Sequence, residues 1–170
     1  MTTRAHTTGF TLMEMMIALL ILAVLSLMIV PVAGNFGVRD QVNETLKVIE
    51  PLKIPIDDYW NSHHEFPEDN EAAGLPDHDK LIGNYFTNVQ VMAGAMHVYF
   101  GNKAHGKLRG KVLSLRPMYV EDSVMSPTSW SCGYSRPPAG MIAAGMNLTT
   151  VDKQLLPVAC RDIAYKGEPE

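Results

Sequence analysis

Apolar side chains are concentrated at the start of the chain, where every residue from Met15 to Val30 is apolar except Ser26. The run from Phe10 to Ala33 is long enough for a membrane-spanning helix, which needs about 20 mostly apolar residues. The short leader before it carries Arg4, as is typical of a cytoplasmic end. This pattern predicts a membrane anchor over 10–34. A cleaved secretory signal is the first alternative, but no small-residue cleavage site closes the run, and a buried core helix is the second.

Beyond the apolar run, hydrophobic positions recur every three or four residues at Val38, Val42, Leu46 and Ile49. This spacing predicts one long helix over 10–49, whose amphipathic continuation over 35–60 packs on a sheet. Pro31 removes a backbone donor, so we expect it to break or bend that helix. Pro51 and Pro55 predict an ending, kink or irregular turn over 50–56, followed by a short helical piece through residue 60.

The pattern changes to strands from Val89 onward. Residues 89–101 and 107–117 flank the turn-rich stretch 102–106, which predicts an antiparallel hairpin, and a third strand is expected over 128–134. The predicted fold class is α+β, with a long N-terminal helix against an antiparallel sheet of about four strands. Residues 61–170 form the expected globular head.

Composition and charge add little that is specific. The 170 residues are 46% hydrophobic and 19% charged, with a formal net charge of −4, which argues against a general nucleic-acid binder. Lys107, Arg109 and Lys111 alternate along a candidate strand and would face one side. With Lys103 and Arg116 they form a candidate phosphate-contacting stripe. Because aromatic interleaving is poor, a solvated strand face is the favoured interpretation.

Residues with catalytic or metal-binding chemistry gather in one polar stretch. The candidates are His63, His64, Glu65, Asp77, His78 and Asp79. Such side chains can ligate zinc, but adjacent histidines point in different directions on any regular element, and the stretch is typical of a polar loop. The sequence holds no nucleophile elbow, phosphate loop or zinc-protease motif. We therefore expect no enzyme activity, no metal site and no cofactor.

Glu14 is an acid at the edge of the apolar run. A carboxylate near a bilayer core costs about 2–3 kcal/mol and usually has a partner. The ordinary interpretation places Glu14 in the headgroup boundary. If instead the Gly9–Phe10 bond is cut, the new amino terminus is a cation four residues from Glu14. In a packed apolar bundle, a neighbouring chain would then have to neutralise each charge.

The stretch GFTLME, Gly9 to Glu14, resembles the type IV pilin family closely. The resemblance implies that a prepilin peptidase removes the leader 1–9, that Phe10 is then N-methylated, and that Glu14 and the Phe10 amine act in assembly. Pro31 falls where pilus-forming members carry a helix-breaking proline. Ala23 departs from the family, in which glycine is common at this position.

The end of the chain, with SWSCGY and LLPVACRD, resembles the terminal disulfide loop of thin-pilus pilins. In an exported domain, Cys132 and Cys160 are expected to pair. The bridge would close a loop of about 29 residues and contribute about 3–4 kcal/mol. Two buried free thiols are the alternative.

The resemblance implies a structural subunit of an extracellular type IV pilus that serves adhesion, surface motility or DNA uptake. The precursor would cross the bacterial inner membrane once, with a periplasmic head. The implied partners are other pilin copies in a helical homopolymer, the prepilin peptidase, and the assembly platform with its ATPase. A minor pilin and a DNA-binding competence pilin are alternatives. A type II secretion pseudopilin is a third, and both Pro31 and the disulfide loop count against it.

Overall fold

The computed structural model describes residues 9–123 and 125–162, without the side chains of 27–36. The chain divides into two compact units, Met1–Gly37 and Val38–Glu170. Helix α1, Leu12–Ile49, belongs to both. The expected leader 1–9 lies outside the described residues except for Gly9. Within the described part of the chain, no helix has both the length and the apolarity of a membrane span. The anchor predicted over 10–34 extends into the residues whose side chains are not described.

Helix α1 begins two residues later than predicted and ends at the predicted residue, Ile49. Pro31 lies inside it, so the helix does not end there. Because Pro31 is among the residues whose side chains are not described, the bend expected there stays a prediction.

The irregular stretch predicted over 50–56 is present, and it contains both Pro51 and Pro55. Pro51 belongs to a short 3₁₀ turn, η1, Glu50–Leu52, and Pro55 to the first turn of α2, Lys53–His63. Proline fits a first helical turn because the backbone N–H groups there have no partner within the helix. Helix α2 closes at His64, whose left-handed backbone (φ 58°) lets its N–H bond to the Trp60 carbonyl.

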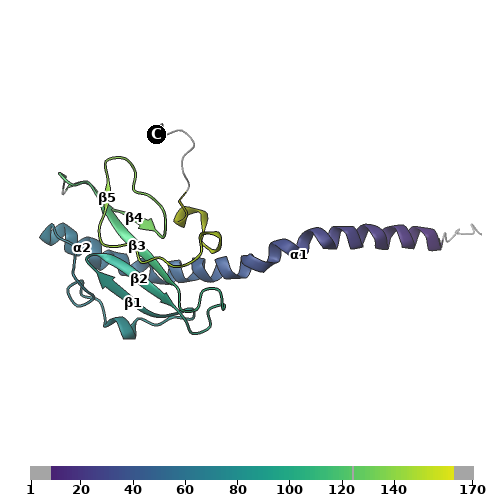
Figure 1. The fold of residues 1–170 in the computed structure, drawn as a ribbon, viewed down its shortest axis with the longest axis horizontal. Coiled ribbons are helices and arrows are strands. Elements are labelled where there is room, and N and C mark those ends of the chain that lie inside the picture. Colours follow the sequence, from purple (N-terminus) through teal and green to yellow (C-terminus); the bar gives the residue numbers. More distant parts are fainter. Residues whose placement is uncertain (1–8, 124, 163–170) are drawn as a thin grey trace, which may run out of the picture. The chain divides into compact units, whose positions relative to one another are not determined.

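The head contains an antiparallel sheet in the order β1-β2-β3-β4, with the two-residue β5 paired to β3 (Figure 1). The strands are β1 Phe86–Met92, β2 Ala95–Phe100, β3 Val112–Tyr119, β4 Ser129–Cys132 and β5 Ile142–Ala143. The third predicted strand, 128–134, is confirmed as β4, which gives way to a turn at Gly133 with φ 58°. The α+β fold class is confirmed.

The prediction of a single strand over 89–101 is wrong, because β1 and β2 form a hairpin within that stretch. The chain reverses at Ala93 and Gly94, with φ values of 48° and 80°. Two successive residues with positive φ are the requirement of the tight hairpin turn that matches strand twist. Gly94 is also needed for space, since a Cβ there would lie 2.7 Å from Phe66.

The strand predicted over 107–117 is wrong in its first half, because β3 begins only at Val112. Residues 101–111 instead form a turn-rich connection, here called the basic loop. It is held by backbone bonds from Leu108 and Arg109 to the His105 carbonyl and by the buried side chain of Leu108. Gly110 has a φ of 75°, which interrupts any extended run.

The core of the head lies between the helices and one face of the sheet. The predicted stripe is buried at Val38, Val42 and Ile49, with Leu46 packed beside it, and α2 adds Ile56. The strands contribute alternating residues from β1, β2 and β3, namely Val89, Val91, Met96, Val98, Leu113 and Leu115. Burial along the helix follows the helical periodicity, which explains why the stripe could be recognised in the sequence. Strands β2 and β3 are buried on both faces, so their polar and apolar positions alternate less clearly.

Candidate functional site

The first turn of α1 is capped by a side chain. Thr11 Oγ1 accepts a hydrogen bond of 3.3 Å from the backbone N–H of Glu14, and both residues are exposed. This is half of a capping box, in which a threonine precedes a glutamate by three residues. Glu14 therefore stands in the first helical turn, where the helix dipole favours a negative charge.

The described part of α1 in the first unit exposes a continuous apolar surface. Its large side chains, together with Phe10 just before the helix, have exposed fractions between 49% and 80%. The helical ones are Leu12, Met13, Met15, Met16, Ile17, Leu19, Leu20, Ile21, Leu22, Val24 and Leu25. The polar Ser26 bonds to the Leu22 carbonyl one turn earlier. An exposed apolar surface of this extent marks a site of association, since burying each such side chain contributes about 1.5–3 kcal/mol.

The predicted disulfide is present, and it joins Cys132 at the end of β4 to Cys160 in the last 3₁₀ turn. Backbone bonds support the same connection, because Tyr134 N–H donates to the Cys160 carbonyl. Gly133 has no room for a side chain here, as a Cβ would lie 2.7 Å from that carbonyl. The alternative of two free thiols is therefore wrong.

The segment inside the disulfide loop crosses the outer face of β3. Ala144 bonds to Pro117 on one side of the strand, and Thr150 exchanges bonds with Val112 on the other. Between them, Leu148 N–H donates to Ser114 Oγ, which also contacts His97 Nδ1 at 2.9 Å. The crossing buries His97, and burial lowers the pKa of its imidazole.

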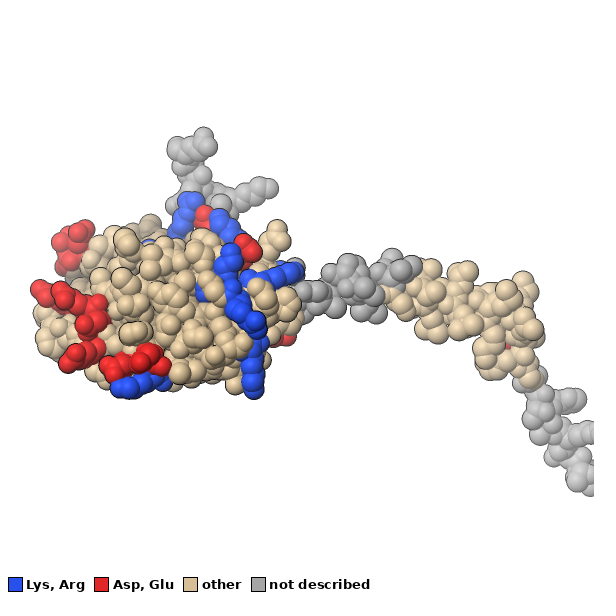
Figure 2. All heavy atoms as spheres, turned by 60° about the horizontal axis from the view of Figure 1, so that its bottom comes forward, with Lys and Arg blue, Asp and Glu red and all other residues tan. Residues whose placement is uncertain are grey.

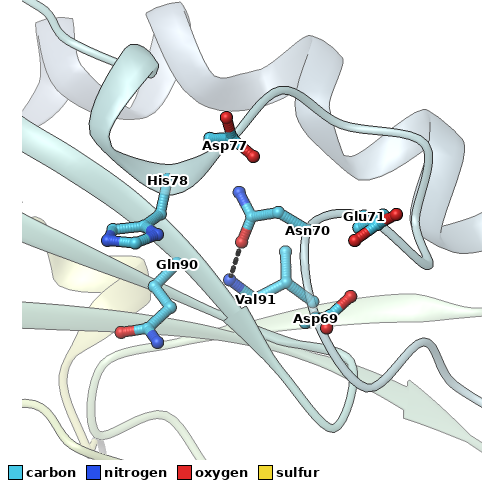
Figure 3. Close-up of a pocket in the computed structure, with 7 residues that line it drawn as sticks. All are labelled: Asp69, Asn70, Glu71, Asp77, His78, Gln90 and Val91. Carbon is cyan, nitrogen blue, oxygen red and sulfur yellow. Dashed lines mark hydrogen bonds between the residues drawn. The ribbon is translucent and has the colours of Figure 1, made fainter.

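A shallow pocket of about 160 Å³ lies between the 64–80 connection and the edge strand β1 (Figure 3). The buried Asn70 side chain occupies its centre. Its Nδ2 donates to the carbonyls of Pro76 and Val89, and its Oδ1 accepts from Val91 N–H at 2.7 Å. Asn70 thus takes the place of a neighbouring strand and closes the exposed edge of β1. The pocket is therefore the place where the 64–80 connection is held to β1, and its role is structural.

The histidines and acids considered for metal binding are spread over several elements. His63 ends α2 and stacks on Tyr59, and Asp77 is paired with Lys80 beside the pocket. Among residues 9–123 and 125–162, no group of three or more metal-ligating side chains is placed to hold an ion.

The cations proposed for nucleic-acid contact do not form a strand face, because Lys107, Arg109 and Lys111 lie in the basic loop. Arg109 donates to the carbonyls of Asn102 and Ala104, while Lys103, Lys107 and Arg109 are exposed. On the face drawn in Figure 2, most of the basic side chains lie toward one end of the head and most of the acidic ones toward the opposite end, with one blue side chain among the red and a few red atoms among the blue.

An exposed apolar helix joined to a disulfide-closed α+β head defines a subunit built to associate through its helix. Comparison with known proteins agrees. The pilin family of bacterial filaments matches residues 38–161, and the prokaryotic N-terminal methylation motif matches residues 4–30. The chain belongs to the pilin family.

Relatives match over almost the whole chain. A type IV major pilin protein PilE1 of Neisseria gonorrhoeae is 32% identical, covering 92% of this chain and 88% of its own. A fimbrial protein of Neisseria meningitidis serogroup B is 30% identical, covering 91% and 94%. The fimbrial protein EcpC of Eikenella corrodens is 26% identical, covering 92% of each.

Membership of the pilin family bears on several expectations drawn from the sequence. The protein is a structural, non-enzymatic type IV pilin, as expected. The family implies polymerisation with other pilin subunits, processing by a prepilin peptidase, and an extracellular location in a pilus.

Two residues that hold the structure together were not among the residues predicted from the sequence. Thr11 was detectable, because Thr11 and Glu14 have the spacing of a capping box. Asn70 gave no comparable signal, since its partners lie 19 and 21 residues away in β1.

Proposed function

We propose that this chain is the major structural subunit of an extracellular type IV pilus. The observation that carries the proposal is the apolar, solvent-exposed helix directly after Gly9-Phe10 and its acid, Glu14. The names of the Neisseria gonorrhoeae relatives, which are type IV major pilin proteins, support the major rather than the minor role.

The proposed pathway begins with a precursor that crosses the inner membrane once, with its head in the periplasm. The prepilin peptidase removes the leader 1–9, and Phe10 is N-methylated. An inner-membrane platform and its ATPase then move the subunit into the filament. Residues 10–34 form the filament core, 35–60 continue that helix toward the head, and 61–170 form the outer surface. Adhesion, surface motility or DNA uptake would depend on that surface.

Glu14 is proposed to pair with the Phe10 amine of a neighbouring subunit. Within one helix the two groups lie about 6 Å apart along the axis, and a cationic terminus is unfavourable at the positive end of the helix dipole. Pairing between subunits neutralises both charges in the apolar core, where attraction is strong and an unpaired charge costs several kcal/mol. The pair would therefore also fix the axial register of assembly.

Processing at Gly9 tests this proposal. In a bacterium with this chain as its only pilin, Gly9→Leu should leave the precursor uncut in the membrane and remove surface filaments. Ala5→Leu adds the same side chain elsewhere in the leader and should leave filaments in place. A mature-length product and normal filaments from Gly9→Leu would refute the proposed processing.

A further inference from the structure

One titratable side chain of the head is buried beneath a segment that has no regular structure. His97 on β2 has an exposed fraction of only 1%. Residues 144–150, here called the crossing segment, pass over it outside the helices and strands. A Cβ on Gly145 would lie 2.6 Å from the Cβ of Ala95, so the segment rests directly on β2 two residues before His97. The imidazole is therefore shielded from water by a segment without secondary structure.

Hydrogen bonds around the ring suit a neutral imidazole. Ser114 Oγ, which lies opposite His97 on β3, accepts the Leu148 N–H at 2.9 Å. The serine hydrogen is then available to His97 Nδ1, also at 2.9 Å, so that Nδ1 accepts and the ring hydrogen lies on Nε2. A proton added at Nδ1 would displace the serine hydrogen, because two donors cannot share one contact.

The surroundings offer nothing that stabilises an imidazolium. His97 Nε2 and Arg116 Nε are both buried and have no hydrogen-bond partner within the part of the chain that the structure describes. Arg116 follows Ser114 by two residues on β3, so it lies on the same face, diagonal to His97. Gln90, opposite on β1, is neutral, and Tyr99 is the other titratable side chain on this face of β2. Neither the strands nor the crossing segment contains a carboxylate, so a protonated His97 would face an arginine and no acid.

The attachment of the crossing segment depends on the group that contacts His97. The ends of the segment are tied to β3 by backbone bonds, at Ala144 and at Thr150. Between these ends, among the residues described, Leu148 has the one backbone N–H that bonds to the sheet, and its acceptor is the Ser114 hydroxyl. Side chains of the two neighbours of Leu148 complete the attachment. Irregular segments with few bonds open at a lower free energy than the sheet beneath them.

We propose that the crossing segment is a pH-controlled latch, closed over His97 while the imidazole is neutral and lifted from β3 in its middle part when the imidazole is protonated. Opening admits water to the ring, which supplies the solvation that a buried cation beside Arg116 lacks. Burial lowers the pKa of His97, so the closed form resists the proton, whereas the open form accepts it near pH 6.5. Opening is therefore favoured as the pH falls below this value. This latch concerns the head alone and does not depend on the proposed function.

Hydrogen exchange of the detergent-solubilised full chain, followed by NMR between pH 7.5 and 5.5, tests the latch. After correction for the intrinsic exchange rate, protection of the Leu148 amide should fall by up to about tenfold over this range, because opening takes up one proton. Its exchange should also depend little on urea, since local opening exposes little surface. The amide of Val98, in the core of β2, should instead show the urea dependence of global unfolding.

Two matched variants assign the effect to His97. His97→Gln removes the titrating group and should abolish the pH dependence of Leu148 protection. His78→Gln removes an exposed histidine and should leave that dependence unchanged. Arg116→Gln removes the facing cation and should reduce the fall in protection.

Constant protection of Leu148 between pH 7.5 and 5.5 in the unaltered chain would overturn the proposal. A urea dependence of Leu148 equal to that of Val98 would do the same, because the segment would then open only with the whole head. An unchanged pH dependence in His97→Gln would also count against it. The first two measurements need no variant, so the latch stays open to refutation even if His97→Gln does not fold.

Discussion

Thr11 Oγ1 accepts the backbone N–H of Glu14 and so closes the first turn of α1. Glu14 therefore combines two features, a backbone N–H that takes part in a local cap and an exposed carboxylate in the same turn. The proposed pairing with a neighbouring Phe10 amine concerns the carboxylate alone. Substitution of Thr11 removes the cap alone, and substitution of Glu14 removes the carboxylate alone, so the two features can be tested separately.

Replacing Glu14 should disrupt assembly more than replacing its cap. Thr11→Val removes the cap, which contributes about 1 kcal/mol of helix stability, and should leave filaments in near-normal number. Glu14→Ala should still be inserted and cleaved but polymerise poorly, Glu14→Asp should be milder, and Glu14→Lys should be worst because it places two cations together. The measurement is the number of surface filaments relative to processed pilin in the membrane. Full piliation by Glu14→Lys would refute the assembly role.

Breaking the disulfide should destabilise the head. Cys132→Ser releases the segment that crosses β3 and removes about 3–4 kcal/mol of constraint on the unfolded chain. Domains are only marginally stable, so we expect less protein and fewer filaments while membrane insertion persists. Thermal unfolding of the detergent-solubilised chain measures the loss, and the double variant with Cys160→Ser should match the single one. Reaction of both cysteines with a thiol reagent in native filaments would contradict this prediction.

Loss of the Asn70 amide should loosen the edge of the sheet. Asn70→Ala leaves the buried N–H of Val91 and the Val89 carbonyl without their side-chain partner, at a cost of about 1–3 kcal/mol. Hydrogen exchange of the β1 amides should rise in this variant. Asn43→Ala, on an exposed position of α1, is the matched control and should leave β1 exchange unchanged. Equal exchange in the two variants would show that Asn70 does not close the edge.

Head stability should fall as pH decreases through the range in which His97 is protonated only when unfolded. Burial lowers the pKa of His97 below its usual 6.5, so the unfolded chain binds the extra proton first. Above pH 6.5, His97 is neutral in both states and does not lower the free energy of unfolding. Below pH 6.5, the free energy of unfolding falls by at most about 1.4 kcal/mol per pH unit. Thermal unfolding of the full chain between pH 5.5 and 7.5 measures this dependence. His97→Gln should show a shallower one, and identical profiles would exclude His97 as the cause.

The sequence predicted those parts of the fold in which one periodicity covers a long stretch. The stripe from Val38 to Ile49 fixed the buried helical face, and Pro51 and Pro55 marked the interruption between α1 and α2. Both signals are local, so each could be recognised without knowledge of distant contacts.

Features that depend on long-range contacts could not be predicted in the same way. The hairpin turn uses Ala93 at positive φ, a residue type that gives little turn signal, so the sequence predicts one strand where the structure has β1 and β2. The basic loop alternates charged and other residues as a strand does, but its turns are set by the buried Leu108 and by the conformation of Gly110. The burial of His97 depends on a crossing segment about 50 residues further along the chain, near Leu148.

The most direct test of the central claim is mass spectrometry of the N-terminal peptide from sheared, purified surface filaments. If this chain is the processed major subunit, the abundant peptide begins at N-methylated Phe10 and the intact subunit carries the Cys132–Cys160 bridge. Filaments that lack this chain, or that contain it with Met1 still attached, would contradict the account.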